Sequence, residues 1–467
     1  MPTLPCDGAP IRPDPDVLVV GGGIVGLFCA YYLRRDGATV TVVERGSVGG
    51  PQSCSYGNTG FVGTQGAMPL AEPGVLAQGL RWLLNPESPF YIKPRLDREL
   101  ASWLWHFRRS CNDQDASAGF RVLLEMKQRS LAILRELCTS DALDGPGRLA
   151  AAFTARGMVV AFKTPAAFEK GCRSVPRAVA NGVPLRVLEP GELRRLEPDV
   201  EFDISGALYN DEGAYLHVPE FVLGFARMLR DLGVQIHTDT EVVGFDVADR
   251  KVRQVRTTRG DFRPGEVVIA AGTWSAQCIR SLGIGLKLQP AKGYSITVKT
   301  PSNAPRLPVL LSEGKVAIVP LGDRLRFGGT LELSGMSNAI SSRRVDGIMR
   351  TVQAHLPQLE SSETVEIWSG LRPCTPDSLP FLGRAEPYRN LCVACGHGYI
   401  GMGLAPVGGK LIAQIVAGQE PDMDLAPFRI GRYDRRYDRR YDGRERRAGA
   451  AAERHGSETT RRPGGRR

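Results

Sequence analysis

A single arginine in a rigid, proline-rich stretch is the first residue whose setting suggests chemistry. Arg372 lies in the segment SGLRPCTPD, residues 369–377, between a leucine and a proline. Gly370, Pro373 and Pro376 favour a fixed, non-helical backbone, so the guanidinium is expected to be held in place. A permanently charged, planar group of this kind binds carboxylates through two parallel hydrogen bonds. The alternative at this point is a structural ion pair or an ordinary surface arginine.

A glycine-rich motif near the N-terminus predicts a dinucleotide-binding unit. An apolar run at residues 17–20 leads directly into Gly21, Gly23 and Gly26, which have G-x-G-x-x-G spacing. A helical pattern and a second apolar run follow, and Glu44 stands at the end of that run. The glycines alone are a weak signal, but this order of elements is that of a complete strand–helix–strand unit with an acidic ribose ligand.

Each part of this unit has a physical role in holding a dinucleotide. The glycines allow a tight turn, a close approach of the pyrophosphate and close packing of the helix on the sheet. The helix N-terminus presents unpaired N–H groups to the phosphates. The carboxylate of Glu44 accepts hydrogen bonds from the adenosine ribose and repels a 2′-phosphate, so NADP is not expected. The residues predicted to contact the cofactor here are Gly21, Gly23, Ile24, Val25, Gly26, Glu44 and Arg45.

A second G-x-G-x-x-G motif, at residues 396–401, is not expected to bind another dinucleotide. It follows an apolar run and precedes a helical pattern from Leu404 to about Ala417, which Gly418 ends. No second strand ending in an acid follows, so the ribose ligand is missing. The N-terminus of this helix instead suits the negative charge that a reduced flavin carries at its N1–O2 edge. The sequence therefore predicts one bound dinucleotide.

Over residues 16–428 the chain resembles a known family. It is similar to the FAD-dependent amino acid oxidoreductases, which include D-amino acid oxidase, glycine oxidase and sarcosine oxidase. Its pattern is most similar to the branch formed by the small subunit of bacterial D-amino acid dehydrogenases. Besides the N-terminal motif, the resemblance is carried by SYGNTG (55–60), AEPGV (71–75), WLLNPESPFYIKPR (82–95), VVIAAGTWS (267–275), PAKGYSI (290–296) and the run from SGLRPCTPDSLPFLGR to GHGYIGMGLAP.

The resemblance implies an α/β fold with a Rossmann-like FAD-binding domain and an α+β substrate domain that carries a mixed or antiparallel sheet. We expect the FAD-binding domain to be discontinuous, because nucleotide motifs occur at both ends of the chain and strand-like runs such as KVAIVP and RLRFGGTLE lie between them. The expected segments are 14–65, 215–285 and 365–428 for FAD binding, 66–214 and 286–364 for the substrate domain, and 429–467 for a disordered arginine-rich tail.

The resemblance also implies FAD contacts outside the first motif. Ser55 and Asn58 would lie along FAD between its phosphates and its ring, and the backbone at Val242 would face adenine. Further expected contacts are Ala271 and Gly272, and, in the loop that would hold the isoalloxazine, Gly398, Ile400, Gly401 and Met402. FAD is expected to be non-covalent, because Gly370 stands where some relatives carry the attaching cysteine and Cys374 is displaced from that position.

In this family the arginine of the G-L-R-P motif binds the substrate carboxylate, and Arg372 matches it. The implied reaction is hydride transfer from the α-carbon of a D-amino acid to flavin N5, giving an imine and then a 2-oxo acid and ammonia. No side-chain base is required if the amine reacts in its neutral form. His397 is predicted either to handle a proton or to donate a hydrogen bond to the flavin. Tyr399 and Tyr294 either line the pocket or belong to an aromatic core.

The substrate side chain and the electron acceptor are left open. The electrons are expected to pass to an acceptor other than NAD, either a quinone or another carrier, or oxygen. The alternatives are an oxidase or dehydrogenase of a cyclic or secondary amino acid, such as D-proline, a hydroxyproline, glycine or sarcosine. A non-catalytic flavoprotein subunit is a further alternative, against which the intact arginine of the G-L-R-P motif argues.

Charge and composition set the expectations about partners and compartment. The 467 residues carry a net charge of +10, but residues 429–467 contain 14 arginines and 6 acidic residues, which leaves +2 for the rest. This argues against nucleic-acid binding, and the tail has too few apolar residues to pack. With no apolar run long enough to span a membrane and no signal peptide, a cytoplasmic protein is expected. Peripheral attachment of the tail to the inner face of the plasma membrane stays open.

The cysteines predict neither a disulfide framework nor a metal site. Ten cysteines at scattered spacings are expected to be reduced thiols. The C-x-x-C pair, Cys392 and Cys395, is interpreted as part of a short buried strand, because a redox or zinc role needs a helix start or a second pair of ligands nearby.

Overall fold

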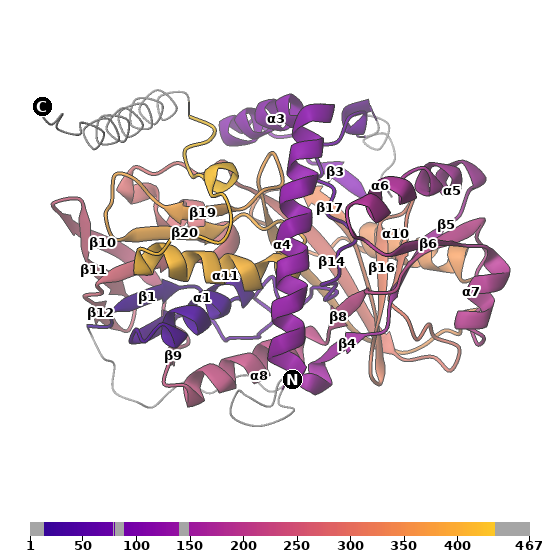
Figure 1. Ribbon diagram of the computed structural model, residues 1–467, viewed down its shortest axis with the longest axis horizontal. Coiled ribbons are helices and arrows are strands. Elements are labelled where there is room, and N and C mark those ends of the chain that lie inside the picture. The colour runs from indigo at the N-terminus through magenta and orange to yellow at the C-terminus, as the bar shows by residue number, and fades with distance from the viewer. Residues whose placement is uncertain (1–13, 78, 80–87, 140–148, 435–467) are drawn as a thin grey trace, which may run out of the picture.

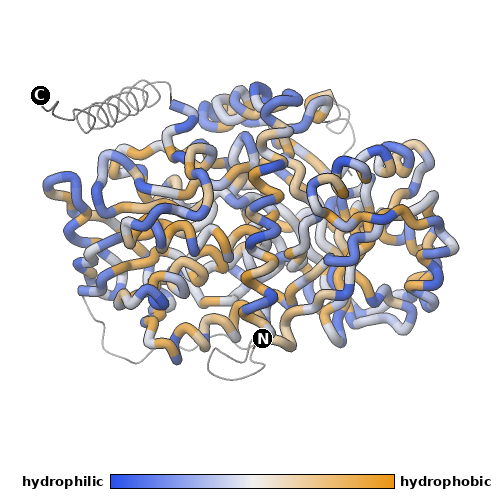
Figure 2. Tube along the Cα trace, in the orientation of Figure 1, coloured by the Kyte–Doolittle hydropathy of each residue, from blue (hydrophilic) through white to orange (hydrophobic). Residues whose placement is uncertain are grey.

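Two large sheets lie side by side in the computed structural model, which describes residues 14–77, 79, 88–139 and 149–434 (Figure 1). The long helix α4 (Asp113–Thr139) crosses in front of the region between the sheets in this view. In Figure 2 the hydrophilic residues gather along the outer helices and loops, and the hydrophobic ones along interior elements. No helix in these described ranges combines the length and the apolarity needed to cross a bilayer.

The sheet at the left of Figure 1 has the order β19-β20-β13-β1-β2-β9. Its neighbours are parallel except for β19 and β20. Every residue of β1 and β2 is buried, as expected for apolar parallel strands that are covered on both faces. The strands are β1 (Val17–Val20), β2 (Val40–Val43), β9 (Gln235–His237), β13 (Glu266–Ile269), β19 (Phe381–Arg384) and β20 (Leu391–Cys395).

Helices cover one face of this sheet and a small sheet covers the other. Helices α1 (Ile24–Arg35), α8 (Val218–Asp231) and α11 (Gly401–Ala417) share one apolar cluster with Val17 and Val19 of β1. Helices α1 and α11 approach closely at Gly409, where a Cβ would lie 2.5 Å from the carbonyl carbon of Phe28. On the other face, the three-stranded sheet of β10 (Val242–Ala248), β11 (Lys251–Thr257) and β12 (Gly260–Phe262) contributes to a second apolar cluster.

The second large sheet is mixed and mainly antiparallel. Its order is β18-β14-β17-β16-β15-β5-β7-β6, with β3 paired to β17. Helix α10 (Ser342–His355) packs against it and shares its apolar cluster. The strands are β3 (Phe90–Ile92), β5 (Met158–Phe162), β6 (Leu185–Leu188), β7 (Gly206–Asn210), β14 (Gln289–Lys299), β15 (Val309–Leu311), β16 (Val316–Leu321), β17 (Arg324–Leu333) and β18 (Thr364–Cys374).

Short elements complete the described part of the chain. They are α3 (Arg98–Ser110), α5 (Pro165–Cys172), α6 (Val175–Ala180), α7 (Pro190–Leu196), α9 (Ser275–Cys278), the strand pair β4 (Phe153–Ala155) and β8 (Ala214–Leu216), and four 3-10 turns, η1 (Ala150–Ala152), η2 (Gly272–Trp274), η3 (Arg280–Leu282) and η4 (Ala426–Phe428).

The predicted α/β fold class is confirmed, whereas the domain division stays our proposal. The six-stranded sheet takes its strands from the three segments assigned to FAD binding, which supports a discontinuous domain. One adjustment is needed: β18 pairs with β14 in the second sheet, so residues 364–374 belong to that sheet. The C-x-x-C pair lies in β20, all of whose residues are buried, as predicted.

The expectation of a disordered tail from residue 429 onward is wrong for residues 429–434. Ile430 is 9% exposed and belongs to the apolar cluster beneath the six-stranded sheet. The side chain of Arg432 is 10% exposed and forms an ion pair with Asp377. A charged side chain can be buried when an opposite charge receives it, and sequence composition alone does not show that partner. Residues 435–467 of the predicted tail lie outside the described residues.

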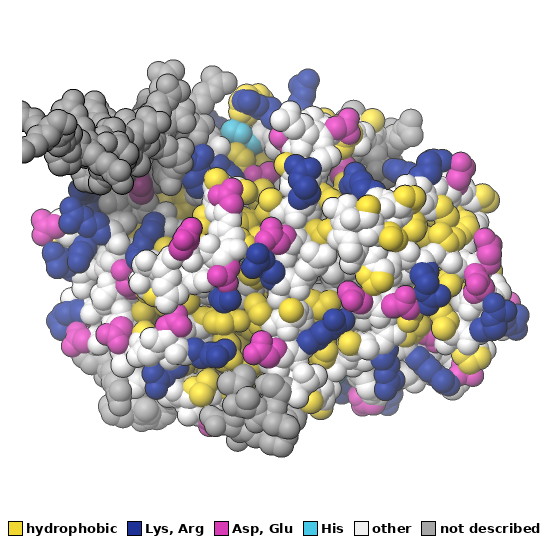
Figure 3. Space-filling view, in the orientation of Figure 1, with side chains coloured by type: hydrophobic (Ala, Val, Ile, Leu, Met, Phe, Trp, Pro, Cys, Tyr) yellow, Lys and Arg dark blue, Asp and Glu magenta, His cyan; other side chains and the backbone are white. Residues whose placement is uncertain are grey.

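The described surface agrees with a nearly neutral body. Figure 3 shows basic and acidic side chains interspersed over this face, without one sign covering a large area. Several of these charges pair locally, for example Arg186 with Asp211 at 2.9 Å. Such pairs lie in solvent and contribute little to stability.

Candidate active site

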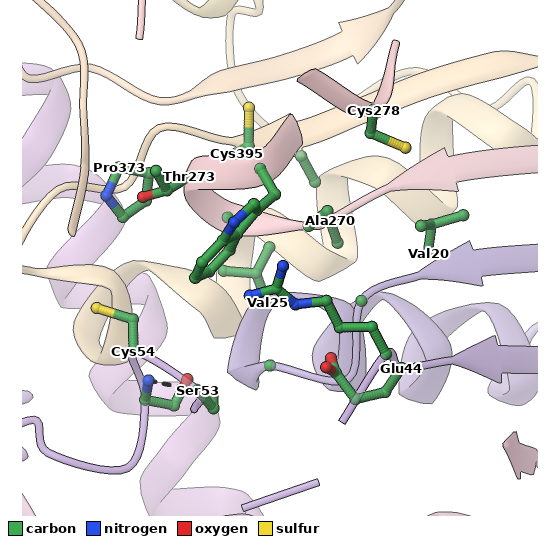
Figure 4. A pocket seen from close by; sticks show the side chains of 18 of the residues that line it. Val20, Val25, Glu44, Ser53, Cys54, Ala270, Thr273, Cys278, Pro373 and Cys395 are labelled. Carbon is green, nitrogen blue, oxygen red and sulfur yellow. Dashed lines mark hydrogen bonds between the residues drawn. The ribbon is translucent and has the colours of Figure 1, made fainter. Parts of the chain in front are cut away.

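A cavity of about 510 Å³ lies at the carboxyl ends of the parallel strands (Figure 4). Val20 at the end of β1, Val43 at the end of β2, Ala270 after β13 and Cys395 at the end of β20 all line it. This edge is where open α/β sheets bind their ligands. The six-stranded sheet therefore places the cavity where the glycine motif predicts a dinucleotide.

The glycines of the first motif are required by close backbone approaches. Gly21 has a φ of +113°, and a Cβ there would lie 2.5 Å from the carbonyl oxygen of Ala270. A Cβ on Gly26 would overlap the carbonyl oxygen of Gly21. The nearest atoms to a Cβ on Gly23 are the hydroxyl oxygens of Ser55, at 3.6 Å, and Ser53, so the backbone at Gly23 is open to the cavity. This cradle fits a pyrophosphate.

Glu44 lies at the end of β2 and lines the cavity. Its Oε2 accepts a hydrogen bond from the backbone N–H of Gly22 at 2.7 Å, and its Oε1 accepts from the N–H of Gly46 at 3.1 Å. Because each carboxylate oxygen accepts two hydrogen bonds, both retain capacity for ribose hydroxyls. Beside it the guanidinium of Arg45 stacks 3.8 Å from the ring centroid of Trp274, and both residues line the cavity.

The segment at residues 53–58 forms a further wall. The Oγ of Ser55 accepts from the N–H of Ile24, the first residue of α1, at 3.2 Å. The Oδ1 of Asn58 accepts from the N–H of Gly60 at 2.8 Å, and its Nδ2 donates to the carbonyl of Tyr399 at 3.4 Å. Asn58 therefore joins this wall to the second glycine loop.

A buried arginine that the sequence analysis missed holds this wall from the other sheet. Arg326 on β17 is 1% exposed, and its guanidinium donates to the carbonyls of Tyr56 at 2.9 Å and Asn58 at 3.1 Å. Nothing local marks Arg326, because its partners lie about 270 residues away in the chain. The strand pattern does not mark it either, because Arg326 alternates with Leu325 and Phe327 in the same way as the partly exposed Arg324.

The other predicted cofactor residues come together at the same cavity. Among those predicted, the cavity is lined by Gly21, Gly23, Ile24, Val25, Glu44, Arg45, Ser55, Asn58, Val242, Ala271, Gly272, His397, Gly398, Gly401 and Met402. Gly26 is outside this lining and lies where α1 packs against the turn at Gly21. Ile400 and Tyr399 line a smaller adjoining cavity together with Cys374.

His397 is buried between the cavity and α11. It is 2% exposed, and neither ring nitrogen has a hydrogen-bond partner among the described residues. Burial lowers the pKa of His397 to about 4, so the ring is neutral at physiological pH. Its Nε2 lies beside Gly408 of α11, where a Cβ would approach within 3.4 Å. A neutral buried imidazole with unused polar atoms fits a site that a ligand completes.

Arg372 lies on β18 next to the cavity, although it is not part of the lining. Thr273 lines the cavity and donates to the carbonyl of Leu371 at 2.9 Å, and Pro373 lines it on the other side of Arg372. Figure 4 shows Thr273 and Pro373 close together at one end of the cavity. The residues that act electrostatically on Arg372 are Cys54, Cys374 and Tyr399, and none of them is a carboxylate.

The guanidinium of Arg372 is held by an unusual backbone conformation. Its Nη1 donates to the carbonyl of Thr330 at 2.6 Å. Thr330 has a φ of +63°, which is rare for a β-branched residue, and it lies where β17 carries one extra residue opposite β14. Across the sheet, a Cβ on Gly293 would overlap the guanidinium. Bulge and glycine together fix the position of the arginine.

The two tyrosines differ in their positions. Tyr294 is 1% exposed, and its hydroxyl donates to Glu332 at 2.8 Å inside the second sheet, so the core interpretation holds. Tyr399 is half-buried, lines the small cavity and acts electrostatically on Arg372. Burial raises the pKa of Tyr399 to about 12, so its hydroxyl keeps its proton.

Comparison with known proteins decides the family. The family model described as FAD dependent oxidoreductase matches residues 16–415. The chain belongs to this family. Among curated relatives, the D-amino acid dehydrogenase of Vibrio atlanticus is 30% identical over 90% of this chain and all of its own length, and that of Methylobacterium radiotolerans is 33% identical over 89% of this chain and 99% of its own. The glycine oxidase of Geobacillus kaustophilus has a structure with a TM-score of 0.72 and 25% identity, covering 90% of this chain and 99% of its own.

These findings confirm the predicted family, the α/β fold and FAD as the cofactor. The protein is an FAD-dependent oxidoreductase, as its membership implies. The cradle of Gly21, Gly23 and Gly26, the carboxylate of Glu44 and the unpartnered imidazole of His397 fit this cofactor along the length of the cavity. The roles of individual residues remain predictions.

Proposed function

We propose that this FAD-dependent oxidoreductase oxidises D-amino acids and that Arg372 binds the substrate carboxylate. The family and the relatives at about 30% identity support amino acid oxidation, and the relatives' name, D-amino acid dehydrogenase, motivates the D configuration. The non-catalytic alternative is disfavoured because the arginine of the G-L-R-P motif is intact and set beside the cavity.

The observation that carries the proposal is a partly buried arginine with no anionic partner among the described residues. In the part of the chain that the structure describes, the guanidinium of Arg372 makes one hydrogen bond, to a backbone carbonyl, and no ion pair. Burial lowers the pKa of Arg372, as expected for a desolvated cation that lacks a counter-ion. A bound carboxylate would supply the missing negative charge and accept hydrogen bonds from the remaining N–H donors of Arg372 in a two-point contact.

FAD bound in this cavity would supply the acceptor for a hydride from the substrate α-carbon, and water would hydrolyse the resulting imine to a 2-oxo acid and ammonia. Arg372 orients the substrate through its carboxylate. The N-terminus of α11, with Gly401 and Met402 in the lining, favours negative charge at that end of the cavity. His397 is neutral, which suits a hydrogen bond better than proton release. The substrate amine therefore reacts in its unprotonated form without a side-chain base.

FAD is proposed to be held without a covalent bond, and the electrons to pass to an acceptor other than NAD. The position of Gly370 offers no attaching side chain. The second glycine motif contributes to the same cavity as the first, through His397, Gly398 and Gly401, so it supplies no nicotinamide site of its own. A quinone, another carrier or oxygen remains as acceptor.

The test is anaerobic mixing of the purified FAD-containing enzyme with matched D- and L-amino acids, D-proline, glycine and sarcosine, following the loss of visible flavin absorbance. We expect rapid bleaching by several D-amino acids and little by their L-enantiomers. Reoxidation by oxygen and by a quinone dye then separates oxidase from dehydrogenase. Preferential bleaching by L-amino acids, by glycine or sarcosine alone, or by none of these compounds overturns the proposal.

A further inference from the structure

Residues 432–433 bind to the loop that follows Arg372, at a site whose polar groups are complementary to the side chain of Arg432. The guanidinium of Arg432 binds both carboxylate oxygens of Asp377, with Nε to Oδ2 at 2.7 Å and Nη2 to Oδ1 at 3.0 Å. This two-point geometry is the strong form of an arginine–carboxylate contact. Because the side chains of Arg432 and Asp377 are only 10% and 19% exposed, solvent screens the pair weakly.

Backbone carbonyls use the remaining donors of Arg432. Its Nη2 donates to Leu379 at 2.7 Å, and its Nη1 donates to Pro380 at 3.3 Å and to Arg429 at 3.1 Å. With the two bonds to Asp377 this makes five, which equals the number of N–H donors on a guanidinium. Lysine has three donors and no planar fork, so it cannot reproduce this pattern.

Aromatic packing adds to these polar contacts. The guanidinium carbon of Arg432 lies 4.2 Å from the ring centroid of Phe381 and 4.8 Å from that of Tyr433. The ring of Tyr433 lies 5.0 Å from that of His106 on α3, and its hydroxyl accepts from the N–H of Asp377 at 3.4 Å. We call Arg432 and Tyr433 the C-terminal clasp.

The loop beneath the clasp, residues 373–380, connects the substrate arginine to the second glycine loop. Its carbonyl at Pro373 accepts from the N–H of Gly398 at 2.9 Å, and Cys374 forms a β-bridge with His397. Trp103 of α3 donates to the carbonyl of Cys374 at 3.0 Å. A shift of this loop would therefore move Arg372 and the residues 396–401 together.

We propose that the C-terminal clasp is a positioning element of the active site: by fixing Asp377 it sets residues 373–380, and through them Arg372 and the second glycine loop. The consequence for substrate binding rests on the proposed function, whereas the effect on the loop does not. The sequence RYDRRYDRRYD repeats the clasp's Arg-Tyr-Asp triplet at 432, 436 and 440; the first copy binds Asp377, and the other two lie outside the described residues. The site on residues 377–381 thus recognises an arginine followed by a tyrosine.

The first experiment compares two shortened chains that differ by three residues. A chain ending at Asp434 keeps the clasp and is expected to match the full chain. A chain ending at Gly431 removes the clasp and is expected to retain FAD but to lose roughly ten- to a hundredfold in kcat/KM for a D-amino acid, mostly through a higher KM. Arg432→Lys in the full chain should fall between. The decarboxylated amine should show little change, because Arg372 does not bind it.

Two further measurements separate positioning from stability and from the proposed function. Backbone hydrogen exchange, which needs no substrate, should speed up at residues 373–380 and 396–401 in the chain ending at Gly431. Adding the peptide GRYDRRYD to that chain should restore both slow exchange and the lower KM. Unchanged exchange in these two segments overturns the proposal that the clasp positions them. Faster exchange in an enzyme that oxidises no amino acid supports the clasp and rejects the function. Faster exchange with an unchanged KM for D-amino acids rejects the link to Arg372.

Discussion

Two loops with the same glycine spacing, residues 21–26 and 396–401, end parallel strands of one sheet and begin helices that pack on each other. The first leads from β1 into α1 and the second from β20 into α11, and both line the same cavity. After α1 the chain returns as β2 and ends at Glu44, whose carboxylate binds the N–H of Gly22. After α11 it ends the helix at Gly418, with φ at +69°, and no strand follows among the described residues.

The second loop makes its contacts with β18, the strand that carries Arg372, instead. Gly398 donates to Pro373, and His397 bridges to Cys374. G-x-G-x-x-G spacing thus produces a strand-to-helix turn in both places, whereas the neighbouring segments determine what the turn binds. In the first loop the neighbour is Glu44, the acid predicted to bind ribose; in the second it is the strand that carries Arg372.

The largest effect is expected from placing a methyl group in each loop in turn. Gly26→Ala puts a Cβ against the carbonyl oxygen of Gly21, whereas Gly401→Ala puts one 3.4 Å from the Cβ of His397. We expect Gly26→Ala to abolish FAD binding and thus activity, because the helix can no longer approach the turn. Gly401→Ala should keep most of its FAD. Absorbance of the purified proteins measures FAD content, and circular dichroism checks that both chains fold.

If Gly401→Ala loses as much FAD as Gly26→Ala in folded protein, the two loops are equivalent and the comparison fails. If Gly26→Ala binds FAD normally, the first loop does not form the cradle described above.

The next largest effect concerns the strand that the second loop contacts. Arg372→Ala should lose roughly 100- to 1000-fold in the efficiency of D-amino acid oxidation, because it removes a charged two-point contact in a desolvated site. Arg372→Lys, which keeps the charge without the planar fork, should fall between. FAD should remain bound in both variants. The measurement is the anaerobic flavin reduction rate with a D-amino acid and with its decarboxylated amine.

Only the amino acid should lose rate in these variants, since the amine lacks the group that Arg372 binds. Equal losses on both compounds would show that Arg372 supports the fold or the flavin instead.

The contrast between the loops also explains how much of the fold and of the site can be predicted from the sequence alone. The unit from Val17 to Glu44 is predicted almost residue by residue, because its turn, helix and return strand interact within about thirty positions. Helix α11 begins at Gly401, a turn earlier than predicted from Leu404. Pro406 inside it is accommodated in a helix that packs against α4, where the N–H of Val407 donates to Ser130.

The residues that sequence reasoning missed act over long distances in the chain. Arg326 holds a wall of the FAD cavity from the other sheet, and Arg432 reaches Asp377 across 55 positions. Both are arginines whose burial depends on carbonyls and a carboxylate that the tertiary fold supplies. From composition alone, such arginines are expected on the surface or in a disordered tail. The strand β18 joins the second sheet for the same reason, since its partner β14 lies about 75 positions earlier.

A smaller effect is expected from removing the acid that distinguishes the first loop. Glu44→Ala deletes the acceptor of the N–H groups of Gly22 and Gly46 together with the proposed ribose contacts. FAD should bind roughly ten- to a hundredfold more weakly, corresponding to about 1–3 kcal/mol of lost hydrogen bonding. Glu44→Gln retains one carbonyl acceptor and should lose less. Titration of the apoprotein with FAD, followed by flavin fluorescence, gives both dissociation constants.

Unchanged FAD affinity in Glu44→Ala would remove the ribose role and with it the main distinction between the loops. The same preparations test attachment: FAD should leave the wild-type protein on denaturation, and flavin that stays on the chain would contradict the non-covalent proposal.

The smallest effect on turnover is expected at His397. This residue and Tyr399 are the ionisable side chains of the second loop. The pKa of His397 is lowered from 6.5 in the unfolded chain to about 4 in the folded protein by burial. The unfolded state therefore binds more protons between these values, and the folded state loses stability as pH falls from about 6.5 toward 4, by at most about 3 kcal/mol. His397→Asn cannot take up a proton, so its free energy of unfolding should fall less steeply over that window.

The pH–rate profile of His397→Asn should keep the wild-type shape between about pH 5 and 8, because the substrate amine and not the imidazole sets this profile. Chemical denaturation at a series of pH values and anaerobic flavin reduction measure the two quantities. A titration in the wild-type profile near pH 6.5 that disappears in His397→Asn would instead make His397 a proton carrier, and the second loop would then take part in the chemistry as well as in its positioning.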